Sequence, residues 1–128
     1  MTAAKFFTLL VAFTACFLVI GIPYWQLPYS SVSLPNSLYG IGLLLTFVCM
    51  VYFCSRGIGF LWVATILGLS APAVVATRII VDVARDSSTH NLFPFEIAIA
   101  VIVGFGVAGF GAALGALSRK IFQTGNVE

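Results

Sequence analysis

The chain has 128 residues, of which 61% are hydrophobic and only 8% are charged. Soluble globular domains carry about 25% charged residues, so this composition excludes an ordinary water-soluble domain. The net charge of +2 comes from six basic and four acidic residues dispersed along the chain. That small, scattered excess excludes the basic footprint expected of a nucleic-acid-binding protein.

Four long apolar stretches without a charged residue predict four membrane-spanning helices. They cover about residues 6–22, 38–54, 58–77 and 97–117, each close to the length that a hydrocarbon core of about 30 Å requires. Lipid offers no partners to backbone amides, and the apolar runs do not alternate every second residue, so helices are expected rather than barrel strands. The sequence therefore predicts an all-α fold, with residues 1–128 forming one domain of four transmembrane helices in an antiparallel bundle.

The basic residues outside these stretches predict an orientation. Four of them fall at one end of the expected bundle: Lys5, Arg56, Arg119 and Lys120. The other two fall at the opposite end: Arg78 and Arg85. By the positive-inside rule, the larger group marks the cytoplasmic face, which predicts an integral protein of the bacterial inner (plasma) membrane with both termini in the cytoplasm. Insertion in both orientations is the less favoured alternative, because it needs a more even count.

The first connection, residues 23–37, is uncharged and rich in proline and aromatic residues. Proline lacks an amide donor and favours extended backbone before it, so we expect that this segment is not a simple helix. Tyr24, Trp25 and Tyr29 carry amphipathic rings that prefer the level of the lipid headgroups, which predicts an interfacial aromatic segment. An ordinary aromatic belt is the first interpretation. The alternative is an aromatic platform that contacts a lipid, a hydrophobic substrate or a partner subunit.

The second and third stretches are joined by three residues only, so we expect them to form an antiparallel hairpin. Within the third stretch, Pro72 removes an amide donor and its ring opposes the carbonyl of Gly68. This predicts a kink between these two residues. Kinks are common in membrane helices, but a kink can also mark a hinge or line a cavity.

Charged residues follow the third stretch at helical spacing. Arg78, Asp82 and Arg85 are separated by four and three residues and therefore share one helix face. The first interpretation is a solvated helix end whose paired charges contribute little stability. The alternative is a docking or ligand-recognition site, to which Asp86 and His90 of the following loop would contribute.

Small residues dominate the fourth stretch and gather on two faces of the expected helix. The first small-residue face consists of Gly104, Ala108, Gly111 and Gly115. The second small-residue face consists of Gly106, Gly109, Ala113 and Ala116. Such faces allow membrane helices to approach closely, so we expect this helix to lie between two neighbours. Whether each neighbour belongs to the same chain or to another chain is open at this point.

Chemistry that needs ionisable groups at membrane depth is not indicated, because no predicted span contains such a group. Glu96, at the start of the fourth span, is the only nearby carboxylate for an ion-coupled carrier. His90 is the only histidine and cannot supply paired haem ligands or a recurrent metal-ligand spacing. The three cysteines, Cys16, Cys49 and Cys54, form no Cys-x-x-Cys pair. We therefore predict no catalytic residue, no metal and no cofactor.

The leading hypothesis is a non-enzymatic subunit of a larger membrane assembly that serves transport. Its contacts would come from the fourth helix and the aromatic connection. One alternative is a homodimeric carrier or channel for a hydrophobic or neutral solute, because four helices alone enclose little space. A second alternative is lipid binding at the outer interface, with the aromatic residues and the two arginines Arg78 and Arg85 around a headgroup. The expected partners are membrane lipids and either another protein or a second copy of the chain.

Overall fold

The computed structural model describes residues 1–126, which are helical apart from connections and contain no strand. The α-helices are α1 (Ala3–Gln26), α2 (Ile41–Ser55), α3 (Phe60–Gly68), α4 (Ser70–Arg85) and α5 (Phe93–Gly125). Two short 3-10 helices, η1 (Tyr29–Ser31) and η2 (Asn36–Leu38), lie between α1 and α2. The predicted all-α fold is confirmed.

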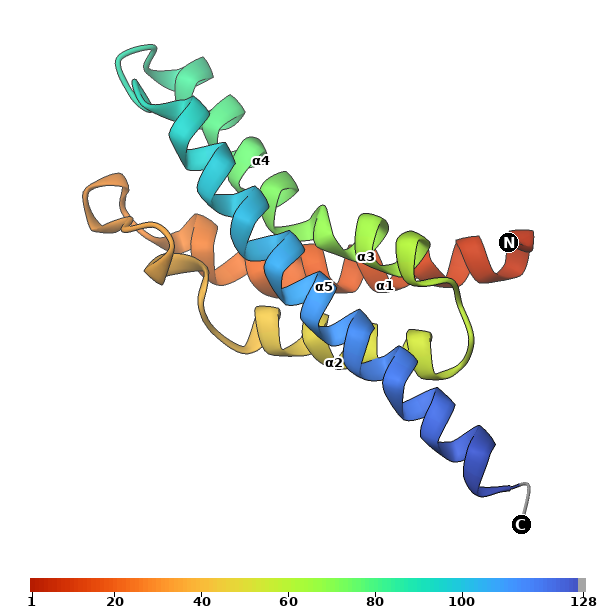
Figure 1. Cartoon of the computed structure of the whole chain (residues 1–128). Coiled ribbons are helices and arrows are strands. Elements are labelled where there is room, and N and C mark those ends of the chain that lie inside the picture. The colour runs from red at the N-terminus through yellow and green to blue at the C-terminus, as the bar shows by residue number, and fades with distance from the viewer. Residues whose placement is uncertain (127–128) are drawn as a thin grey trace.

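Helix α1, helix α2, the continuous pair α3–α4 and helix α5 run alternately in opposite directions along the bundle (Figure 1). The N-terminus, the α2–α3 connection and the C-terminal end of α5 lie at one end, which we call the basic end. Its basic residues are Lys5, Arg56, Arg119 and Lys120. The segments 27–40 and 86–92 lie at the opposite end, which we call the loop end. Four basic residues therefore lie at the basic end and the other two, Arg78 and Arg85, lie toward the loop end, as the sequence predicts.

Three helical segments are long and apolar enough to cross a membrane: α1, the continuous stretch Phe60–Arg85 formed by α3 and α4, and α5. The fourth apolar helix, α2, has only 15 residues. At 1.5 Å per residue it is about 22 Å long, which is less than a hydrocarbon core of about 30 Å. It is shorter than the predicted span 38–54 because Leu38 belongs to η2 and the chain is not helical at residues 39 and 40.

Helix α1 continues through Pro23 to Gln26, four residues beyond the predicted first span. The rest of the first connection is not a simple helix, as predicted. Pro23 removes one intrahelical hydrogen bond, a loss that membrane helices tolerate when neighbouring groups stabilise the turn. Here the indole Nε1 of Trp25 donates to the Val74 carbonyl of α4 at 3.1 Å. Tyr24 is only 1% exposed and packs in the core.

The aromatic platform predicted from Tyr24, Trp25 and Tyr29 is therefore not present as a continuous exposed surface. Tyr24 is buried, Trp25 is half-buried against α4, and only Tyr29 is exposed, at 49%. The reason is that the last turn of α1 directs the first two rings into the bundle. The rings contribute to packing at the loop end of the bundle.

The third apolar stretch is interrupted at the position where a kink was predicted. Helix α3 ends at Gly68 and α4 begins at Ser70, with Leu69 between them. Pro72 has no amide hydrogen to offer the Gly68 carbonyl, so the regular bond from residue 72 to residue 68 is missing. Helix α5 approaches this carbonyl closely, because a Cβ atom added to Gly104 would clash with the Gly68 oxygen. The break and the close approach of α5 occur at the same level of the bundle.

Candidate functional site: a buried polar cluster at the loop end

Arg78 is the centre of a polar cluster that joins α4 to the end of α1. The residue is 7% exposed. Its terminal nitrogens donate to the carbonyls of Tyr24 at 2.7 Å and Leu27 at 2.6 Å, and its Nε donates to Asp82 at 3.2 Å. The guanidinium carbon also lies 5.2 Å from the centre of the Tyr24 ring. A cation at carbonyls that end a helix is favourable, since these groups carry the negative end of the helix dipole.

His90 joins the same cluster from the 86–92 connection and is 2% exposed. Its Nε2 lies 2.8 Å from a carboxylate oxygen of Asp82, and its Nδ1 lies 2.6 Å from a carboxylate oxygen of Glu96. A neutral imidazole has one N–H only. A neutral ring can therefore donate to only one of the two carboxylates. The other contact is a hydrogen bond only if the ring or that carboxyl group carries a further proton. The His90 ring thus lies between the carboxylates of two different helices, Asp82 of α4 and Glu96 of α5.

The backbone of His90 is held by further contacts. Its φ angle of 54° lies in the left-handed region, which few residues other than glycine adopt. Its amide donates to the hydroxyl of Tyr29 at 3.0 Å, and the two rings meet edge to face with centres 4.8 Å apart. Three separate elements thus fix this residue: η1, α4 and α5. A strained residue fixed by several elements is typical of a functional position.

The local sequence explains how these groups meet. Arg78 and Asp82 are one helical turn apart on α4, which allows their ion pair. Glu96 lies in the first turn of α5, where a negative charge is favourable. Asp86 begins the intervening turn by accepting hydrogen bonds from the amide and the hydroxyl of Ser88. These two bonds hold the pKa of the Asp86 carboxyl below its usual value.

The expectation of a solvated helix end with weak charge pairs is wrong for Arg78, which is buried. His90 lies in the loop between α4 and α5 as predicted, but its side chain is buried. The structure joins Arg78, Asp82 and Glu96 through direct contacts with His90 or with each other. Arg85 is exposed and stays outside this cluster. The tyrosines Tyr24 and Tyr29 contact the cluster, which the sequence did not indicate.

Two cavities flank the cluster. One has a volume of about 300 Å³ and is lined by Trp25, Thr77, Arg78, Val81, Asp82 and Arg85. We call it the arginine cavity. The other has a volume of about 270 Å³ and is lined by Tyr29, Val32, Leu34, His90 and Glu96. Arg78, Asp82 and Arg85 therefore line one cavity, and His90 and Glu96 line the other. Each cavity is large enough for a small chemical group.

The first small-residue face of α5 packs within the chain. A Cβ atom on Gly111 would lie 3.1 Å from the Met50 Cβ, and one on Gly115 would lie 2.5 Å from the Val51 carbonyl oxygen. Ala108 is fully buried in the same row. These positions and Gly104 hold α5 against α2, α3 and α4, so this predicted seam closes within one chain.

The second small-residue face of α5 is open. A Cβ atom added to Gly106 or Gly109 would meet no atom within 4 Å. Ala113 is exposed and Ala116 is half-buried. Of the two small-residue faces, only the first is therefore packed within residues 1–126, and no helix of that part of the chain covers the second.

Within residues 1–126, no group of three or more His, Cys, Asp or Glu side chains is arranged to hold a metal ion. The two nitrogens of the His90 ring face different carboxylates on opposite edges of the ring, so they do not converge on one point. The cysteines are unpaired: Cys16 and Cys54 are buried, and Cys49 is half-buried. Comparisons with models of protein families, with curated proteins and with solved structures find no match to this chain.

Proposed function

We propose that the chain is a non-enzymatic membrane protein that crosses the bilayer four times and serves as a subunit of a larger membrane assembly. The observation that carries this proposal is the difference between the two small-residue faces of α5. The face around Gly111 is filled by the chain itself, whereas the face around Gly106 and Gly109 has no neighbour among residues 1–126. Because glycine weakens a helix by about 1 kcal/mol, a second row of glycines calls for a packing partner.

The partner we propose is a membrane-spanning helix of another subunit. Association of helices in lipid depends on close backbone packing, which Gly106 and Gly109 permit. The short helix α2 supports the same conclusion, because a span below the thickness of the hydrocarbon core is accommodated by thinning of the bilayer or by association with other helices.

The task we propose for the assembly is transport, with this chain in an accessory role. The predicted spans contain no charged residue, so ion- or substrate-coupling groups would belong to the partner. We also propose that the basic end faces the cytoplasm of a bacterial cell, because it carries four basic residues and the loop end carries two.

A photo-crosslinking side chain placed at Gly109 tests the open face directly. We expect one discrete adduct that is heavier than the monomer and does not have twice its mass. The matched position is Val48, which is exposed in the middle of α2 and should form no protein adduct. Adding Gly106→Leu should remove the adduct without unfolding the chain, because nothing lies within 4 Å of a Cβ atom there.

Two outcomes would contradict this proposal. Adducts of equal yield at Gly109 and Val48, or none at either position, would show that the second small-residue face has no specific partner. An adduct of twice the monomer mass would overturn the heteromeric partner in favour of the homodimeric alternative.

A further inference from the structure

The arginine cavity lies between the C-terminal end of α1 and the outer part of α4, and its six lining residues are of two kinds. Arg78, Arg85, Asp82 and Thr77 carry polar groups, whereas Trp25 and Val81 are largely apolar. This combination suits an amphiphilic ligand, whose polar group and apolar chain need different surroundings.

The charges of the cavity favour an anion. Arg85 is exposed and makes no ion pair within residues 1–126. Asp82 is the only acidic residue in the lining, and its carboxylate is already in contact with both Arg78 and His90. The two guanidinium groups therefore leave an excess of positive charge at the cavity wall.

Arg78 also keeps donors for a ligand. A guanidinium has five N–H groups. The hydrogen bonds of Arg78 to Asp82, Tyr24 and Leu27 use three of them. Two remain, one on each terminal nitrogen, on a side chain that is held in place by its other bonds. Guanidinium groups match the oxygens of phosphate well, because several planar donors contact several acceptors.

The position of the cavity indicates where such a phosphate comes from. Trp25 is held by its bond to the Val74 carbonyl near the end of the apolar part of the bundle, and tryptophan is typical of the headgroup level. Val81, on the cavity wall, is 41% exposed, and its neighbour Ile80 is exposed on the outer surface. An acyl chain can therefore continue from the cavity along an apolar surface.

We propose that the arginine cavity binds the phosphate group of an anionic membrane lipid. Arg85 and the free donors of Arg78 contact the phosphate oxygens, and Trp25 and Val81 contact the upper part of an acyl chain. Free phosphate shares the recognised chemistry, so a test has to separate the two sources.

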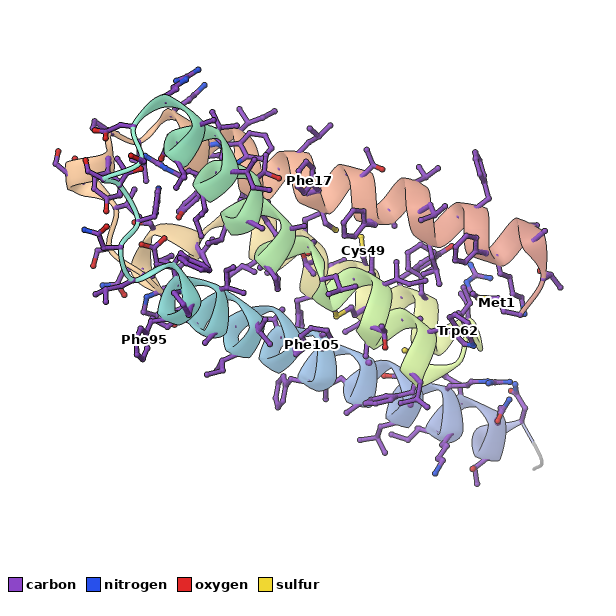
Figure 2. All side chains as sticks on the ribbon, turned by 90° about the horizontal axis from the view of Figure 1, so that it is seen from above. Met1, Phe17, Cys49, Trp62, Phe95 and Phe105 are labelled. Carbon is purple, nitrogen blue, oxygen red and sulfur yellow. The ribbon has the colours of Figure 1, made fainter. Side chains whose placement is uncertain are left out.

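Quenching of tryptophan fluorescence reports on this cavity. The chain has two tryptophans, and Trp62 lies near Met1 at the basic end, far from the loop end where Phe95 lies (Figure 2). Trp62→Phe therefore leaves Trp25 as the single reporter. The protein is placed in phosphatidylcholine vesicles that contain either brominated phosphatidylglycerol or brominated phosphatidylcholine. We expect the phosphatidylglycerol to quench Trp25 preferentially.

Arg85→Gln should reduce this preference roughly fivefold, which is the effect of one basic residue near a charged membrane surface. Arg85→Lys should restore most of it. The matched control is Arg119→Gln, which removes the same charge at the basic end and should leave the preference at Trp25 unchanged. Circular dichroism confirms that each variant is folded.

Repeating the quenching measurement in sodium phosphate and in sodium chloride of equal ionic strength distinguishes a lipid headgroup from free phosphate as the ligand. A preference that survives phosphate supports a lipid headgroup as the ligand. Its selective loss in phosphate overturns the lipid as the preferred source and assigns the site to free phosphate. Equal quenching by the two lipids in the parent protein, or equal effects of Arg85→Gln and Arg119→Gln, would overturn the proposed site.

Discussion

Arg78→Met is expected to lower the free energy of unfolding by about 3 kcal/mol, because removal of one partner from a buried charged group leaves the others uncompensated. The substitution deprives the Leu27 carbonyl and the Asp82 carboxylate of a donor and weakens the hydrogen bonding of the Tyr24 carbonyl. It therefore releases the end of α1 from α4. Reversible unfolding in mixed detergent micelles, followed by circular dichroism, measures the change.

Arg85→Met is the matched control. It removes the same charge from the same helix, but Arg85 is exposed and lies outside the cluster. Surface substitutions of this kind change stability by less than about 0.5 kcal/mol. Equal losses for the two variants would show that Arg78 acts through its charge alone and does not fasten α1 to α4.

Gly115→Leu is expected to destabilise the protein by about 3 kcal/mol, the upper part of the range for overpacked cores. A Cβ atom at this position would lie 2.5 Å from the Val51 carbonyl oxygen and 2.7 Å from the Cys54 Cβ. Since backbone atoms cannot turn aside as a side chain does, α2 and α5 would have to separate. The same unfolding experiment measures the loss.

Gly106→Leu makes the identical substitution on the same helix and serves as its control. The space around Gly106 is open, and leucine is a better helix former than glycine by up to about 1 kcal/mol. The variant should be at least as stable as the parent protein. If Gly106→Leu unfolds the monomer as strongly as Gly115→Leu, the assignment of the two faces of α5 is wrong.

The features that the sequence predicted are those that depend on local pattern. Glycine and alanine at spacings of three and four placed Gly104, Ala108, Gly111 and Gly115 on one face of α5, and the structure buries that face. The break between α3 and α4 lies where the missing amide of Pro72 predicted a kink. Both features require knowledge of one helix only.

The end of α1 was mispredicted because one local rule received too much weight. Proline was taken to end the helix, although the buried residues Leu9, Cys16, Ile20 and Tyr24 share one face that continues beyond Pro23. This spacing was present in the sequence and would have placed Tyr24 in the core. The tertiary contacts at the end of α1 outweigh the single hydrogen bond that proline removes.

The polar cluster could not be predicted, since its contacts join residues that are distant in the chain. Arg78 binds carbonyls of residues 54 and 51 positions earlier, and backbone carbonyls carry no sequence signal. His90 is the only histidine and lies in a polar loop, and its side chain and backbone contact Tyr29, Asp82 and Glu96, which come from three different elements. Such sites depend on how the helices cross, which periodicity does not specify.

The four-span arrangement is tested most directly by labelling single cysteines in intact bacterial cells with a membrane-impermeant maleimide. A variant without Cys16, Cys49 and Cys54 receives one cysteine, either in a connection, at Ser33, Gly59 or Ser88, or in the exposed last turn of α5, at Thr124. We expect the cysteines at 33 and 88 to react in intact cells, and those at 59 and 124 to react only after the membrane is opened. Labelling of positions 33 and 59 from the same side would show that α2 does not cross the bilayer and would contradict the four-span arrangement.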